Sequence, residues 1–197
     1  MATSVNTTSK FTTTNNMTAN IGDTDNQENR DYFQADDVVD WQASGKACTS
    51  LPTTFLTSSR QGISVQVSIA SGSLLRIDQT SVDASGFEMG EALLSTGHGN
   101  PGPMTIVFEH PIYGVNIKVQ PDTTDDSEYT VSIEGFDRLD TSIKKIKLPG
   151  ISQKGGSGAT CLNLLDSKGR IKKLVLSAKE QGIHIPFVIN TIKLKTA

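Results

Sequence analysis

The residues best suited to hold a ligand are three carboxylates of one short segment. Asp122, Asp125 and Asp126 follow Pro121, and Glu128 lies two residues further on. Calcium prefers such oxygen-rich loops. The spacing differs from that of an EF-hand, however, and no glycine stands at the position of the sharp turn. We therefore name the three aspartates as candidate calcium ligands, although we favour the interpretation that they form a solvated turn. We predict no other cofactor.

A catalytic constellation is not indicated by the other polar residues. The histidines are His98, His110 and His184, and none pairs with another at the spacing of metal ligands. No Gly-x-Ser-x-Gly segment is present that would form a nucleophile elbow. The glycine-rich segment 155–158 is flanked by strand-like sequence, whereas a phosphate-binding loop precedes a helix. We therefore predict that the protein is not an enzyme.

The basic and aromatic residues disfavour nucleic-acid binding. Lysine dominates over arginine, and aromatic residues, which would stack on bases, make up only 6% of the chain. We favour the interpretation that the lysines lie on solvent faces and edge strands, where they prevent aggregation of sheet edges. The candidates for stacking on a sugar are Trp41, Tyr113, Tyr129 and Phe136, and we expect most of them to be buried.

The elements that must position these side chains are short strands. Apolar and polar residues alternate with a period of two in segments 62–69, 103–109, 112–120, 128–134, 160–164, 170–177, 183–189 and 191–196. An extra residue between Ile171 and Leu174 predicts a β-bulge. Turn signals such as Pro149-Gly150 separate the runs, and no segment has a helical period. The sequence predicts an all-β fold over residues 36–197, an antiparallel two-sheet β-sandwich of jelly-roll type.

A polar arm precedes the predicted sandwich. Residues 1–35 are rich in Thr and Asn and too poor in apolar side chains to build a core, so we expect an arm that is disordered or docked on a neighbouring chain. Its sparse apolar residues Val5, Phe11, Met17 and Ile21 are spaced by even numbers, which places all four on one side of an extended strand. These four are candidate assembly residues, expected to insert beside the edge of a neighbouring sheet.

Charge is distributed unevenly along the 197 residues. Residues 1–137 contain six Lys and Arg against 18 Asp and Glu, a net charge of −12, whereas residues 138–197 contain 12 against three, a net charge of +9. Two arrangements are compatible with this pattern. Either acidic and basic strands are neighbours throughout one sandwich, or the molecule has one acidic and one basic face, through which copies can stack head to tail. Whether Cys48 and Cys161 are bonded stays open at this stage.

Composition excludes several classes of protein. The apolar runs are too short for a membrane-spanning helix, the 17 glycines follow no collagen period, and two cysteines are too few for a disulfide scaffold. Residues 1–20 lack the apolar core of a signal peptide, so a cytoplasmic location stays open.

Several segments together resemble a known group of proteins. They are Asp37-Val38-Val39-Asp40-Trp41, residues 91–97 before a Gly/Asn/Pro loop, and residues 103–108, 111–115 and 131–137. Their order resembles the β-sandwich domains of uncharacterised bacterial proteins, many of them cyanobacterial, that often carry PEP-CTERM sorting tails. The resemblance implies a non-enzymatic, exported sandwich, extracellular or at the cell surface. No sorting tail is seen, so the resemblance does not imply membrane anchoring for this chain. It also implies no site residues.

Two functions follow as hypotheses. The leading one is a structural protein that associates with copies of itself into a filament, sheath or surface layer, through the arm and the charge asymmetry. The alternative is a β-sandwich module that binds a carbohydrate or exopolymer, with calcium as a stabiliser. The predicted partners are thus a second copy of the chain or a polysaccharide, with neither nucleic acid nor membrane insertion.

Overall fold

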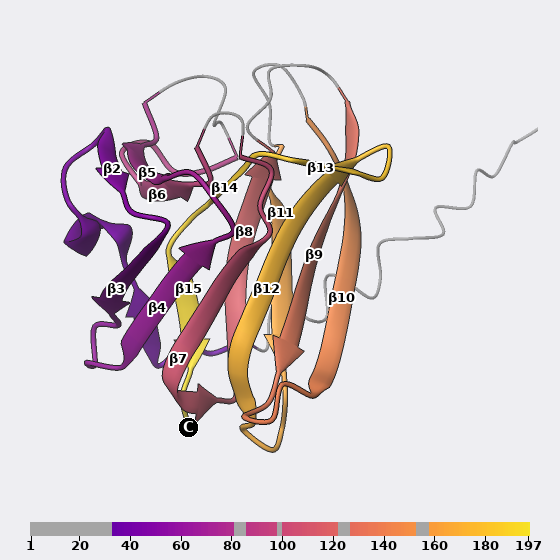
Figure 1. Ribbon diagram of the computed structural model, residues 1–197. Helices are drawn as coiled ribbons and strands as arrows, with labels where there is room; N and C mark the ends of the chain where they lie inside the picture. The colour runs from indigo at the N-terminus through magenta and orange to yellow at the C-terminus, as the bar shows by residue number, and fades with distance from the viewer. Residues whose placement is uncertain (1–32, 81–85, 98–99, 122–126, 153–157) are drawn as a thin grey trace, which may run out of the picture.

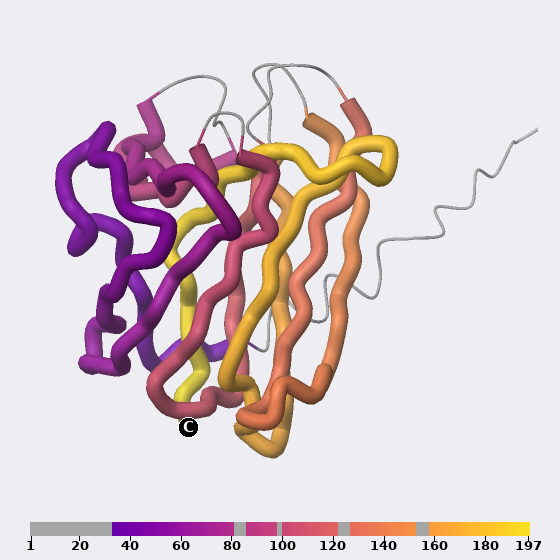
Figure 2. The backbone as a smooth tube through the Cα atoms, viewed as in Figure 1, coloured from indigo at the N-terminus to yellow at the C-terminus, as the bar shows by residue number. Residues whose placement is uncertain are grey.

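Two antiparallel β-sheets pack face to face in a sandwich, as predicted (Figure 1). The computed structural model describes residues 33–80, 86–97, 100–121, 127–152 and 158–197. The chain passes repeatedly from one sheet to the other, as in a jelly roll, and the backbone trace shows one layer in front of the other (Figure 2). Within the described residues the helical element is the short 3-10 helix η1 (Trp41–Ser44), and no helix there is long and apolar enough to cross a membrane.

The first sheet contains eight strands within the described residues. Its order is β1-β15-β8-β14-β6-β5-β2, and β11 also pairs with β8. The strands are β1 (Asp37–Val39), β2 (Thr49–Leu51), β5 (Leu74–Asp78), β6 (Ala92–Ser95), β8 (Gly114–Pro121), β11 (Thr160–Leu165), β14 (Phe187–Ile189) and β15 (Ile192–Lys195).

The second sheet contains seven strands within the described residues and faces the viewer in Figure 1. Its order is β10-β9-β12-β7-β4-β3, and β13 also pairs with β12. The strands are β3 (Thr54–Ser58), β4 (Ser64–Ile69), β7 (Met104–Ile112), β9 (Glu128–Phe136), β10 (Ser142–Ile151), β12 (Ile171–Glu180) and β13 (Ile183–Ile185).

The core lies between the two inner faces. In β9 the side chains of Val131 and Ile133 are fully buried, while Thr130, Ser132 and Glu134 alternate with them on the outer face. Each fully buried Ile, Leu, Val or Phe contributes about 1.5–3 kcal/mol of transfer free energy. The same alternation that builds the core therefore sends a regular set of polar side chains to the outside of the sheet.

Trp41, the only tryptophan of the chain, lies at the edge of this core and is fully buried. Its indole Nε1 donates a hydrogen bond of 2.8 Å to the backbone carbonyl of Asn190. The Asn190 side chain accepts from the backbone N–H of Lys118 at 2.8 Å and donates to Glu91 Oε1 at 3.0 Å. Asn190 thus joins η1, β8 and the segment before β6 at the link between β14 and β15.

Two sequence predictions about strands are wrong and one is confirmed. Pro149-Gly150 is not a turn: it lies within β10, paired with Thr130 and Tyr129 of β9, and β10 is an edge strand, where proline is tolerated. Segment 183–189 is not one strand, since Pro186 separates β13 in the second sheet from β14 in the first. The predicted bulge is confirmed as a register shift between Ile171 and Lys173.

A carboxylate clamp holds the first and last strands of the sandwich together. β1 pairs with β15, and Asp36 Oδ1 accepts hydrogen bonds from the Thr196 backbone at 2.8 Å and from its hydroxyl at 2.9 Å. The Ala197 backbone N–H donates to Asp36 Oδ2 at 3.1 Å. Burial raises the pKa of Asp36, but the bonds from Thr196 and Ala197 outweigh it and lower the pKa below its usual value.

The two cysteines are not bonded to each other. Cys48 is exposed, and Cys161 is half-buried in β11, where its Sγ accepts a hydrogen bond from Asn116 at 3.2 Å. The open question of a disulfide is therefore answered in the negative.

Candidate functional site

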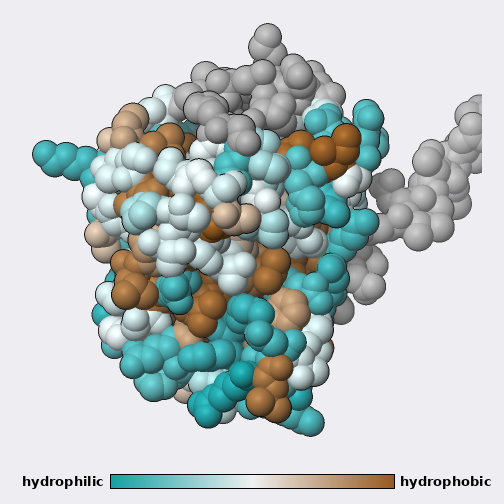
Figure 3. Space-filling view, in the orientation of Figure 1, coloured by the Kyte–Doolittle hydropathy of each residue, from teal (hydrophilic) through white to brown (hydrophobic). Residues whose placement is uncertain are grey.

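The outer face of the second sheet gathers polar side chains in rows that cross the strands. The register places Lys147 of β10, Ser132 of β9 and Ser177 of β12 side by side in one row. The next row contains Lys145 beside Glu134. In the space-filling view of this face, pale residues of intermediate hydropathy occupy much of the centre and teal hydrophilic residues border them (Figure 3). The face is a hydrogen-bonding surface supported by rigid strands.

Two adjoining depressions in this face form what we call the face groove. Its mid-strand part has a volume of about 340 Å³ and lies over β9, β10 and β12, with His184 of β13 at its border. Its hairpin-end part has a volume of about 690 Å³ and lies beside the β12–β13 hairpin. Thr130 and Lys179 line both parts, so the two run into one another. From Glu134 to Glu128 along β9 the groove extends about 20 Å, at about 3.4 Å per residue.

The mid-strand part contains a fixed ion pair. Glu134 Oε2 accepts from the Lys145 ammonium at 2.8 Å, and Glu134 Oε1 accepts from the Ser142 hydroxyl at 2.8 Å. These two bonds, that of Lys145 first, hold the pKa of Glu134 below its usual value, so the carboxylate stays ionised near neutral pH. Beside it the hydroxyls of Ser132 and Ser177 lie 2.9 Å apart and share a hydrogen bond.

His184 borders the same part from β13, opposite Lys179. Burial, and then the positive charge of Lys179, lower the pKa of His184 below its usual value. The imidazole is therefore uncharged near neutral pH, and the positive charge of the groove comes from its lysines. His184 Nδ1 is buried and has no hydrogen-bond partner among the described residues.

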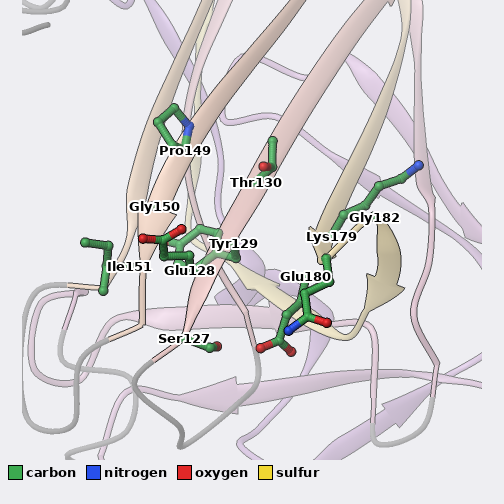
Figure 4. Close-up of a pocket in the computed structure, with 11 residues that line it drawn as sticks. Ser127, Glu128, Tyr129, Thr130, Pro149, Gly150, Ile151, Lys179, Glu180 and Gly182 are labelled. Carbon is green, nitrogen blue, oxygen red and sulfur yellow. The ribbon is translucent and has the colours of Figure 1, made fainter.

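The hairpin-end part is bordered by side chains from the ends of three strands. Figure 4 shows Glu128 and Ile151 at the ends of β9 and β10, and Lys179 and Glu180 across from them on β12. The Lys179 ammonium points away from the Glu180 carboxylate in this view (Figure 4). Tyr129 lies under this end, where its hydroxyl donates to the Gly158 carbonyl and lies 3.0 Å from Thr160 Oγ1.

Most of the candidate stacking aromatics are buried, as we expected. Trp41 is fully buried and Tyr129 is only 3% exposed. Phe136 is half-buried on the outer face, but the Lys173 ammonium lies 4.6 Å from its ring centroid and also pairs with Asp140 at 2.6 Å. Tyr113 is 36% exposed and lies against Gly169, outside the groove. Recognition in the face groove therefore falls to hydroxyl, carboxylate and ammonium groups.

The residues that we named as ligands from the sequence are not the ones that line this groove. Asp122, Asp125 and Asp126, the candidate calcium ligands, lie outside the described residues, and so do the arm residues Val5, Phe11, Met17 and Ile21. Calcium binding and self-association through the arm stay predictions. Within the described residues no group of three or more His, Cys, Asp or Glu side chains is placed to hold a metal ion.

Two further aspartates, Asp137 and Asp166, hold turns together. Asp137 Oδ1 accepts from the backbone N–H groups of Leu139 at 2.8 Å and Thr141 at 2.9 Å. Asp166 accepts from Nε and Nη2 of Arg170, both at 3.0 Å. The bonds from Arg170 lower the pKa of Asp166, which keeps it ionised. Both carboxylates thus take part in turns.

No protein-family model matches the chain, and no curated protein does either. Among solved structures, a DUF4465 family protein from Bacteroides caccae is 10% identical with a TM-score of 0.44, and the match covers 83% of this chain and 95% of that one. The CBM22-1 xylan-binding domain from Paenibacillus barcinonensis is 13% identical with a TM-score of 0.38, covering 78% and 99%. A family 29 carbohydrate-binding module from Piromyces equi is 11% identical with a TM-score of 0.34, covering 75% and 89%. At these values the similarities place the chain in no family.

The sequence did not predict the groove because one of the strands that line it, β10, was not predicted. β10 supplies Lys145 and Lys147, but the interpretation of Pro149-Gly150 as a turn concealed this strand. The usable signal was the set Ile143, Ile146 and Leu148, all half-buried against the core. A register shift between Ser142 and Lys144 interrupts the period of two, so Ile143 and Ile146 are three residues apart instead of two.

Proposed function

We propose that this protein is a binding module that holds a polysaccharide chain in the face groove. The observation that carries the proposal is the groove itself, an elongated depression in two connected parts of about 340 and 690 Å³. A trough about 20 Å long, at about 3.4 Å per residue of β9, suits an extended polymer better than a compact small molecule.

The chemistry of the lining supports a sugar ligand. A sugar presents many hydroxyl groups, each of which both donates and accepts hydrogen bonds. The groove offers matching partners: the hydroxyls of Thr130, Ser132 and Ser177, the acceptor oxygens of Glu128, and the donor ammonium of Lys147. Because these groups stand on paired strands, little backbone conformational entropy is lost when a chain binds.

A groove-blocking variant tests the proposal. Thr130 lines both parts of the groove from the outer face of β9, so T130W fills the junction between them. The matched control is Q66W, because Gln66 is exposed on β4 of the same sheet and lies outside the groove. Unchanged thermal unfolding of both variants will show that each is folded.

The measurement is affinity electrophoresis against soluble neutral and acidic polysaccharides, followed by calorimetry with those that retard the protein. We expect at least one polysaccharide to retard the unmodified chain and Q66W equally, and T130W to bind at least about tenfold more weakly, a cost of about 1.4 kcal/mol. Absence of retardation by every polysaccharide, or equal binding by T130W, would overturn the proposal.

A further inference from the structure

The mid-strand part of the face groove carries a surplus of positive charge. Its lining includes Lys145, Lys147 and Lys179 against the single carboxylate of Glu134, and His184 is uncharged near neutral pH, so the net charge is +2. Glu134 is already neutralised by Lys145 at 2.8 Å. The surplus therefore belongs to the other two lysines.

Lys147 and Lys179 make no ion pair within the part of the chain that the structure describes, and their ammonium groups donate no hydrogen bond there. The register puts Lys147 level with Ser177, two residues before Lys179, and β9 separates the two strands. Two strand spacings across and two residues along the strand set their Cα atoms about 12 Å apart. Two lysines whose Cα atoms lie this far apart can direct their flexible side chains at two anionic groups carried by one chain.

The other end of the groove limits how densely that chain is charged. The hairpin-end part is lined by the carboxylates of Glu128 and Glu180 with Lys179 between the two parts. A polymer with an anion on every unit would meet these carboxylates along the same trough, which costs free energy. A polysaccharide in which acidic sugars alternate with neutral ones avoids this repulsion.

We propose that the ligand of the face groove is an acidic polysaccharide whose anionic groups pair with Lys147 and Lys179. This inference rests on the proposed polysaccharide-binding function and adds the chemical class of the ligand. The shared chemistry is an anionic substituent on a sugar, either a carboxylate or a sulfate ester, and the neutral sugars of the chain occupy the hairpin-end part.

The test compares polymers that differ only in charge. Calorimetry is carried out on the full chain with partially methyl-esterified homogalacturonan, in which acidic and neutral units are interspersed, against the fully methyl-esterified polymer, and with sparsely sulfated dextran against dextran. We expect tighter binding of the charged member and weakening with added salt, because exposed charges are screened. Preference for charge in both pairs supports an anion in general, and preference in the first pair alone supports a carboxylate.

Charge-removing variants locate the effect. K147Q/K179Q is expected to lower affinity for the acidic polymer about tenfold, since two partly exposed ion contacts are lost. The matched control K168Q/K193Q removes the same charge at exposed positions outside the groove and is expected to bind as the unmodified chain does.

The outcomes separate this inference from the proposed function. If T130W abolishes binding but charged and methylated polymers bind alike, the groove binds a polysaccharide and the acidic ligand is overturned. If K147Q/K179Q binds the acidic polymer as tightly as its control, the pairing with these lysines is overturned. Equal affinity for duplex DNA and for the acidic polymer would also overturn it, because the intermittent charge would then play no part.

Discussion

Replacing Asn190 by aspartate tests the buried network at the joint between β14 and β15. Asn190 is 8% exposed, and its amide nitrogen donates to Glu91 Oε1 at 3.0 Å. N190D keeps the shape of the side chain and the acceptor for the Lys118 backbone N–H. It replaces the donor with an oxygen, so two carboxylates face each other where a charge-assisted hydrogen bond existed.

The expected cost follows from two effects. Loss of a hydrogen bond to a charged group removes about 1.5–3 kcal/mol. Burial beside a second carboxylate raises the pKa of the introduced carboxyl, and each unit of that shift removes about 1.4 kcal/mol at neutral pH. Together we expect N190D to lower the free energy of unfolding by about 3–4 kcal/mol at pH 7. At about 2–4 °C per kcal/mol for a chain of this size, Tm falls by about 10 °C.

The pH dependence distinguishes this cause from simple loss of packing. A carboxyl whose folded-state pKa is raised above its unfolded value of about 3.9 destabilises the protein above the folded pKa and no longer does so below the unfolded one. The difference between N190D and the unmodified chain should therefore shrink as pH falls from 7 to 4. The protonated carboxyl then donates to Glu91 as the amide does in the native structure.

The assay is urea unfolding followed by the fluorescence of Trp41, the only tryptophan and fully buried, at several pH values. The control is N116D, which makes the same chemical change at a half-buried asparagine of β8 that donates to Cys161 rather than to a carboxylate. We expect it to cost less than N190D and to show no recovery down to pH 4. A loss for N190D that is the same at pH 7 and pH 4 would refute the reasoning.

Two smaller changes test other parts of the structure. D166N removes the charge that pairs with Arg170 and turns one acceptor oxygen into an amide donor, and it should cost about 1 kcal/mol at pH 7, because Arg170 is partly exposed. Since the folded-state pKa of Asp166 is lowered, urea unfolding should show the difference shrinking as pH falls through that pKa. A large difference that persists in strong acid would contradict this. G150A places a Cβ into the ring of Tyr129 below the hairpin end of the groove and should lower stability by about 1–3 kcal/mol in a thermal melt. G62A, where nothing lies near the added carbon and the φ angle is positive, unlike that of Gly150, measures backbone strain without steric overlap.

The period-two runs were sufficient to predict the fold class and most of the central strands. In β9 and β4 one set of alternating residues is buried without interruption, so the sequence itself shows which face meets the core. The same holds for the bulge in β12, where the extra residue between Ile171 and Leu174 shows in the sequence spacing. These features are local, and local spacing can predict them.

The strands that were missed lack this local signal. β10 is an edge strand with no fully buried residue, so its burial alternates between half-buried and exposed rather than between core and solvent. β13 and β14 form one alternating run, and only Pro186 shows that it changes sheet. The face groove depends on which strands are neighbours: Lys147, Thr130 and Lys179 meet through the pairing of β9 with β10 and β12. A single sequence carries no direct record of that pairing.

The clamp at Asp36 has a consequence for how the chain can be cut and rejoined. Since Asp36 is bonded to Thr196 and Ala197, a short linker can connect residue 197 to residue 36 and close the sandwich into a covalent ring. New ends opened at the exposed Lys168, in the turn between β11 and β12, would interrupt no pair of strands. The C-terminus and the β12–β13 hairpin lie at opposite poles of the molecule (Figure 1). The β11–β12 turn lies at the same pole as the C-terminus (Figure 1), so a circularly permuted chain should present the same groove with its new ends, and any fused partner, still away from the hairpin end.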